Sequence, residues 1–257
     1  MNQIEKAKAL IQTFANGNSQ QALELLDPSY IQHNLNYPTG SKAFAASVAA
    51  LGEAPVKTTV ENIRAFEDGD KVFLHTVYDF AGQGKQVAFD IFRFNKDGKI
   101  AEHWDNLTDL NGKNPSGHTQ IDGPVQADSF NQTEANRQLV KDFLFDVLQN
   151  NHPEKIADYF ENGAYIQHNT EIADGRSGLG VALAAMAAKD IEMVYNQVHQ
   201  VLADGNFVLA VSEGTFGDKS TSYYDLFRIE NGKIREHWDV METILPESEW
   251  KNENGKF

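Results

Sequence analysis

The sequence predicts an α+β protein made of two copies of one domain, and three observations support this. The pentapeptide YIQHN occurs at 30–34 and again at 165–169, 135 residues later. The tetrapeptides DIFR at 90–93 and DLFR at 225–228 keep the same spacing. Within each copy, segments with helical apolar spacing come first and strand-like segments follow, which is the element order of an α+β domain.

Composition excludes several classes of protein. The chain has 257 residues, 41% of them hydrophobic, which suits two globular domains. It has no cysteine, which excludes disulfides, thiolate nucleophiles and cysteine-ligated metal sites. A formal charge of -15 argues against nucleic acid or an anionic membrane surface as partner. Because no signal-like or membrane-spanning apolar run is visible, we expect a cytoplasmic protein.

A third repeated motif fixes the organisation of the chain. GKI and EHWD at 98–105 return at 232–239, 134 residues later, so each copy is the size of a domain. A polar stretch rich in glycine and proline separates the copies and is typical of a linker. The expected organisation is copy one at 1–110, a linker at 111–131, copy two at 132–246 and a polar tail at 247–257.

Each copy is expected to begin with three helices. Ile4, Leu10 and Phe14 share one helical face at the start of copy one, as do Leu139 and Phe143 in copy two. The second and third helices are expected at 20–26 and 41–51, and at 153–159 and 179–188. The YIQHN segment between them is expected to be a strand.

Four antiparallel strands are expected to follow, near 58–66, 72–80, 86–94 and 99–108 in copy one. The loop before the last strand sets its register. A two-residue loop places Asp90 opposite Asp105, whereas a three-residue loop places Asp90 opposite Trp104. The shorter turn of copy two, Asn231-Gly232, favours the second register, and a β-bulge would reverse it.

These elements and motifs resemble the SnoaL-like branch of the nuclear transport factor 2 family. The nearest subgroup is that described as SnoaL-like aldol-condensation or polyketide-cyclase-like proteins. The resemblance implies cone-shaped, cystatin-like domains, each with three N-terminal helices packed on a curved antiparallel sheet over an apolar pocket. It also implies an aspartate that acts as general acid and base without metal or cofactor. By motif, this aspartate is Asp105 in copy one and Asp239 in copy two.

The EHWD strand carries the main candidate catalytic residues. Side chains alternate along a strand, so His103 and Asp105 share one face and Trp104 lies on the other. A carboxylate beside an imidazole in an apolar pocket can be tuned to take a proton alpha to a carbonyl. Alternatively, the histidine and aspartate only fasten the end of a strand. The copy-two counterparts are His237 and Asp239.

The YIQHN motif adds candidate orienting residues. His33 and Asn34 offer donors and acceptors that could position a carbonyl or enolate oxygen. In the alternative interpretation, Asn34 caps the loop and His33 satisfies buried backbone groups. The copy-two counterparts are His168 and Asn169.

Other residues are candidates for binding a ligand. Asp90 and Asp225 lie in apolar strands, either as pocket residues or as paired buried acids. His75 could join His33 and His103 in a metal site, but their long-range spacing gives little support, so no metal and no cofactor are expected. The remaining ligand-binding candidates are Tyr37, Trp104 and Trp238.

The expected function is cofactor-free isomerisation, aldol cyclisation or hydrolysis of a small apolar carbonyl compound. The alternatives are a non-catalytic binding module for such a metabolite, and a structural duplication that supplies a dimer-like interface. The copies are expected to pack sheet to sheet as an intrachain pseudo-dimer, and further oligomerisation is possible. Copy one is expected to be the active one, because copy two replaces His75 and Tyr78 by Val211 and Gly214.

Overall fold

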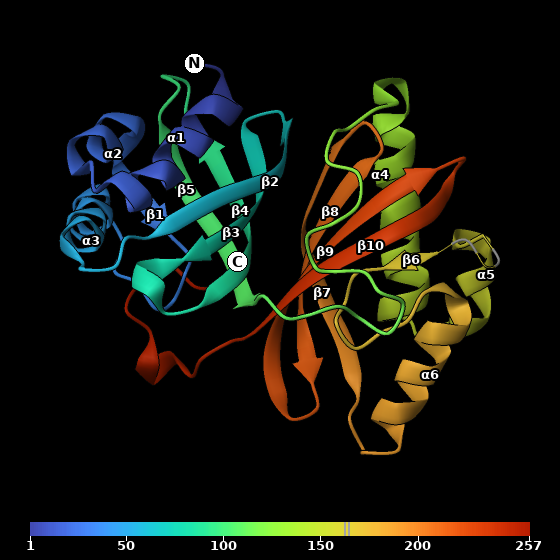
Figure 1. Ribbon diagram of the computed structural model, residues 1–257. Helices are drawn as coiled ribbons and strands as arrows, with labels where there is room; N and C mark the ends of the chain where they lie inside the picture. Colours follow the sequence, from blue (N-terminus) through green and yellow to red (C-terminus); the bar gives the residue numbers. More distant parts are fainter. Residues whose placement is uncertain (162, 164) are drawn as a thin grey trace. The chain divides into compact units, whose positions relative to one another are not determined.

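Figure 1 shows the computed structural model, which describes residues 1–161, 163 and 165–257. The chain forms two compact units. Unit 1 consists of Met1–Leu110 with Leu245–Phe257, and unit 2 consists of Asn111–Ile244. Each unit holds one copy of the repeated motifs on helices and a five-stranded sheet, which confirms the predicted α+β fold. No described helix is long and apolar enough to span a bilayer.

Unit 1 has its helices first and its sheet afterwards. Its helical segments are α1 (Gln3–Asn16), α2 (Ser19–Leu25), α3 (Ser41–Glu53), η1 (Phe80–Gly82) and η5 (Glu247–Glu249). Its strands are β1 (Leu26–Gln32), β2 (Thr59–Asp68), β3 (Lys71–Asp79), β4 (Lys85–Phe94) and β5 (Ile100–Asp109). In the order β1-β5-β4-β3-β2, β1 runs parallel to β5 and the other neighbours are antiparallel.

Unit 2 repeats this plan. Its helical segments are η2 (Phe130–Gln132), α4 (Thr133–Phe143), the π-helical η3 (Leu144–Gln149), η4 (Pro153–Lys155), α5 (Ile156–Tyr159) and α6 (Gly175–Ala187). Its strands are β6 (Ile166–Gln167), β7 (Met193–Asp204), β8 (Phe207–Phe216), β9 (Lys219–Glu230) and β10 (Lys233–Thr243). The sheet order β6-β10-β9-β8-β7 matches that of unit 1.

The first helix begins and ends at residues suited to those positions. Asn2 Oδ1 accepts the backbone N–H of Glu5, and the Glu5 carboxylate accepts the backbone N–H of Asn2, which forms a capping box. Gly17 ends the helix with φ 70°, a conformation that glycine adopts at little cost. A Cβ at Gly17 would lie 2.7 Å from Gly52 Cα, so this glycine also permits α1 to approach α3.

The core of unit 1 lies between the helices and one face of the sheet. Leu10 and Ile11 of α1 belong to one buried cluster with Leu74 of β3 and Phe92 of β4. Because strand side chains alternate, the even-numbered positions of β3 and β4 point toward the helices. Asp90 occupies this face, directly opposite Leu74. The Asp90 carboxylate therefore lies on the helix-covered side of the sheet.

A β-bulge sets the register of the last hairpin in each unit. In unit 1 the pairing shifts between Phe94↔Ile100 and Arg93↔Glu102, so that Asp90 lies opposite Asp105. The register expected from the loop length, with Asp90 opposite Trp104, is wrong because the bulge absorbs the extra residue. Unit 2 has a bulge at the matching place, between Ile234 and Glu236, and Asp225 lies opposite Asp239.

The two segments expected to be a linker and a tail are packed parts of the units. The segment that follows β5 belongs to unit 2, and the segment that follows β10 belongs to unit 1. Both contain the motif KNxxG, at 113–117 and 251–255. Asn114 Nδ2 donates to Ile172 O (3.0 Å) and Asn252 Nδ2 donates to Tyr37 O (2.9 Å). Since these acceptors lie at matching positions of the repeat, each copy is completed by the segment that follows the other copy.

This packing predicts a specific loss of stability. Asn252→Ala removes the donor to the carbonyls of Asn34 and Tyr37, which lie in a buried and a partly buried contact. We expect the free energy of unfolding to fall by about 1–3 kcal/mol, the cost of unsatisfied buried acceptors. Thermal unfolding of the full chain measures this, with the exposed Glu253→Ala as control. Equal stability of the two variants would show that the tail does not hold unit 1 together.

Candidate active site

Each unit encloses a cavity between its helices and its sheet. The cavity of unit 1 has a volume of about 330 Å³ and that of unit 2 about 490 Å³, within the range of small-molecule pockets. Apolar and aromatic side chains make up most of both linings. The exceptions of chemical interest are Asp90, His103 and Asp105 in unit 1 and Asp225, His237 and Asp239 in unit 2.

In unit 1 the bulged hairpin brings two carboxylates to one histidine. His103 Nε2 lies 3.0 Å from Asp90 Oδ1 and 4.0 Å from Asp105 Oδ2. The hydroxyl of Tyr78 donates to Asp90 Oδ2 (3.0 Å), and Asn34 Nδ2 donates to Asp105 Oδ2 (3.0 Å). All three members of this Asp–His–Asp triad are at most 6% exposed. Sequence reasoning placed His103 and Asp105 on one face, and the structure brings Asp90 to them.

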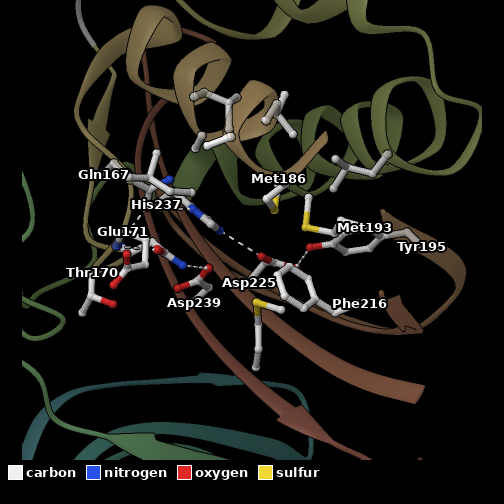
Figure 2. Close-up of a pocket in the computed structure, with 18 of the residues that line it drawn as sticks. Gln167, Thr170, Glu171, Met186, Met193, Tyr195, Phe216, Asp225, His237 and Asp239 are labelled. Atoms are coloured by element: carbon white, nitrogen blue, oxygen red, sulfur yellow. Dashed lines mark hydrogen bonds and ion pairs between the residues drawn. The ribbon is translucent and has the colours of Figure 1, made fainter. Parts of the chain in front are cut away.

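Unit 2 builds the same triad with a more firmly held histidine (Figure 2). His237 Nε2 lies 2.9 Å from Asp225 Oδ1, and its Nδ1 lies 3.1 Å from Gln167 Oε1. Asn169 Nδ2 donates to Asp239 Oδ2 at 2.7 Å. Because both ring nitrogens face oxygen atoms, this geometry favours a proton on each, the imidazolium form of His237.

Burial and neighbouring charges shift the triads' proton affinities. Burial raises the pKa of Asp90, and the charge of Asp105 adds to this, while the hydrogen bond and charge of His103 oppose it. Burial likewise raises the pKa of Asp239. For His237 burial lowers the pKa, but the hydrogen bond and charge of Asp225 outweigh it, so the net shift is upward. Asp90, Asp239 and His237 therefore hold protons more readily than exposed aspartates and histidines do.

A tyrosine hydroxyl is kept in both units by an exchange between neighbouring strands. Copy two has Gly214 where copy one has Tyr78, but the hydroxyl of Tyr195 on β7 donates to Asp225 Oδ2 (3.1 Å). The cross-strand pair Val60–Tyr78 of unit 1 corresponds to Tyr195–Gly214 of unit 2. A Cβ at Gly214 would lie 1.7 Å from Val194 O, so the strands approach too closely there for another residue. The sequence indicates this exchange, because copy two has Tyr195 in place of Val60 and Gly214 in place of Tyr78.

The units differ in the access to the second carboxylate. Asp105 is buried, and among the described residues its Oδ1 has no hydrogen-bond partner. Asp239 is half-buried in the larger cavity. Tyr37, a ligand-binding candidate from the sequence, does line the cavity of unit 1, while Glu171 takes part in the lining of unit 2. The expectation that copy one is the active one stays a prediction.

The histidines of the YIQHN motif point away from the cavities. Because Gln32 and Asn34 face the cavity of unit 1, the intervening His33 lies on the other face of the sheet. There its Nε2 lies 2.8 Å from Glu102 Oε1, and its ring stacks on Trp104 at 4.8 Å. His168 has the same arrangement in unit 2, with Glu236 at 2.8 Å and Trp238 stacked at 4.4 Å. The proposed orienting role of His33 and His168 and the proposed ligand contacts of Trp104 and Trp238 therefore have no support in the cavities.

His75 is likewise not a cavity residue. It is fully buried on the face of β3 away from the helices, where its Nδ1 lies 2.7 Å from Arg64 Nη1. Its ring meets that of Phe89 edge-on at 4.7 Å. The metal site considered for His75, His33 and His103 is not formed, because each ring belongs to a different group of contacts.

Comparison with known proteins agrees with this architecture. The model of the SnoaL-like domain matches residues 7–103 and 140–237, one segment in each copy. The chain belongs to the SnoaL-like domain family. Among curated proteins, none matches the sequence significantly.

Solved structures align with part of the chain at low identity. An NTF2-like protein of unknown function from Cytophaga hutchinsonii has 15% identity over 42% of this chain and 91% of that chain, with a TM-score of 0.37. A proposed polyketide cyclase from Bacillus cereus has 19% identity over 41% and 73%, with a TM-score of 0.36. An LEH-like epoxide hydrolase of M. tuberculosis has 16% identity over 41% and 82%, with a TM-score of 0.37.

The triad of this SnoaL-like chain predicts the titration of His237. The pKa of His237 in the folded protein lies above 6.5 because of Asp225. The contact between the two residues therefore stabilises the fold fully below pH 6.5, and this stabilisation is lost as pH rises through the pKa of the folded protein. In Asp225→Asn burial remains while the larger raising contribution is gone and only the charge of Asp239 opposes burial, so the midpoint should fall. NMR titration of the histidine ring signals measures both, with the exposed His152 as internal control. An unchanged midpoint in Asp225→Asn would contradict the triad.

Proposed function

We propose that the cavity of unit 2 is a cofactor-free acid–base site that moves a proton on a small apolar carbonyl compound. The observation that carries this proposal is the half-buried Asp239 carboxylate in a cavity of about 490 Å³, with its Oδ2 held by Asn169. A carboxylate with a raised pKa is a stronger base than an exposed one, and its surroundings keep bulk water away from the transferred proton.

His237 supplies the charge that this chemistry needs. One ring nitrogen of His237 and one carboxylate oxygen each of Asp225 and Asp239 lie within 4.8 Å of one another. When Asp239 takes a proton from the carbon alpha to a carbonyl, the C–H electron pair forms the enolate and the negative charge moves to its oxygen. The fixed imidazolium stabilises the carboxylate before this step and the enolate after it. Asp225 and Gln167 hold the ring so that it does not have to reorient.

The protonated Asp239 then completes either of two reactions. Returning the proton to a different carbon isomerises the substrate. If the enolate carbon instead attacks a second carbonyl, the new alkoxide takes the proton and the result is an aldol cyclisation. Both outcomes balance without a cofactor.

For unit 1 a second candidate function is favoured by a specific observation. Both Asp105 and Asp90 are buried, and the cavity there is smaller, at about 330 Å³. A site whose carboxylates are shielded in this way suits binding of an apolar metabolite better than turnover. The two copies would then divide catalysis and binding between them.

The proposed function predicts exchange of alpha protons. The full chain is incubated in D2O with a panel of small ketones and β-dicarbonyl compounds, and deuterium incorporation is followed by NMR. We expect Asp239→Asn to slow the exchange about 100- to 10,000-fold, the usual contribution of a positioned general base. Asp105→Asn should have a much smaller effect.

The exposed Asp190→Asn serves as the matched control, because it removes a carboxylate from the surface of the same unit. Exchange that persists in the Asp105→Asn/Asp239→Asn double variant would reject the acid–base site. Binding of a compound without any catalysed exchange would instead support the non-catalytic alternative.

A further inference from the structure

Unit 2 contains a second group of histidine and carboxylate side chains, outside the cavity. His118 and Asp122 lie in the segment between β5 and α4, and His168 follows β6. His168 Nδ1 lies 2.7 Å from Asp122 Oδ1, and His118 Nδ1 lies 3.8 Å from Asp122 Oδ2. One ligating atom from each residue falls within 4.8 Å of the other two.

Each ring is oriented from behind by another carboxylate. His168 Nε2 lies 2.8 Å from Glu236 Oε1, and His118 Nε2 lies 3.1 Å from Asp174 Oδ2. A proton on each Nε2 satisfies these contacts and leaves the Nδ1 atoms to bind a cation. His168 Nδ1 also lies 2.7 Å from the carbonyl oxygen of Thr119, a contact that a bound cation replaces. A carboxylate behind a histidine is the arrangement that orients imidazole ligands at metal ions.

The negative charge of this group favours the binding of a cation at its centre. Three carboxylates contact or adjoin the two rings, those of Asp122, Asp174 and Glu236. The guanidinium of Arg228 contacts Glu236 but is shared with Glu230. Two protons on the histidines or one divalent cation would offset two of these negative charges.

We propose that His118, Asp122 and His168 form a binding site for one divalent transition cation of the Zn²⁺ type. Imidazole nitrogens and a carboxylate oxygen are suitable ligands for it, and water can take the fourth position. Ligand atoms around tetrahedral zinc lie about 3.3 Å apart, a value between the two separations of 2.7 and 3.8 Å. Asp122 is 43% and His118 32% exposed, so the cation can enter from solvent and the carboxylate can adjust.

Unit 1 provides an internal comparison. His33 keeps its contact with Glu102, and its Nδ1 lies 2.9 Å from the carbonyl oxygen of Gly255, just as His168 Nδ1 lies 2.7 Å from that of Thr119. The difference between the units lies in the second histidine. In the KNxxG motif of unit 1 the residue after the glycine is Lys256, where unit 2 has His118. A lysine cannot replace the second imidazole at neutral pH, so the site is specific to unit 2.

Zinc titration of the full chain tests this proposal. After treatment with chelator, isothermal titration with ZnCl₂ should show one saturable site that His118→Asn and Asp122→Asn abolish. Asp174→Asn keeps an acceptor for the N–H of Gln167 but weakens the orientation of His118, so affinity should fall about 10- to 100-fold. Circular dichroism and thermal unfolding confirm that each variant is folded.

The triads of the cavities are the competing zinc sites, because each also gathers two carboxylates and a histidine. The Asp105→Asn/Asp239→Asn variant should therefore keep the zinc affinity of the original chain. Absence of saturable binding would overturn the proposal. So would binding that survives in His118→Asn and Asp122→Asn but is lost in the double variant of the cavities.

Discussion

The positions of the two aspartates and the histidine in each site depend on how the last two strands of the unit pair. A bulge beside the hairpin turn places Asp90 opposite Asp105, and Asp225 opposite Asp239. Two carboxylates facing each other under a layer of helices would repel strongly, and a histidine one pleat away contacts the first of them in each unit. Shifting the register by one residue would turn His103 and Asp105 to the opposite face and leave a single buried acid without its partner. The bulge is therefore part of the site's construction, and its presence in both copies explains why both triads have the same geometry.

Around this shared centre the two copies use different supports. The hydroxyl on the first aspartate comes from Tyr78 in one unit and from Tyr195, one strand further out, in the other. The ring of His237 is held at both nitrogens, whereas Nδ1 of His103 has no hydrogen-bond partner among the described residues. These differences, together with the larger cavity of unit 2, are the reasons for proposing that proton transfer takes place in unit 2. The exchanged KNxxG segments add a dependence of each copy on the chain that follows the other, so the duplication is more than two independent domains in series.

The sequence predicted the fold class and much of the triad for identifiable reasons. Repetition of whole motifs reveals a duplication directly, and strand alternation is enough to put His103 and Asp105 on one face. Alternation also implied that residues 33 and 34 face opposite ways, but which of them faces the cavity depends on how β1 joins the sheet. The bulge could not be predicted, because loop length and bulge compensate each other in the register. The role of Tyr195 and the packing of segments 111–131 and 245–257 depend on contacts between residues far apart in sequence, which local patterns do not encode.

The central claim is that the cavity of unit 2 contains a doubly protonated histidine beside two facing aspartates, and neutron crystallography of the deuterated full chain tests it most directly. At near-neutral pH the account predicts deuterons on both Nδ1 and Nε2 of His237, with Nε2 directed at Asp225 and Asp239 within reach of the same ring. A ring carrying one deuteron, or an Asp239 carboxylate turned out of the cavity, would contradict it.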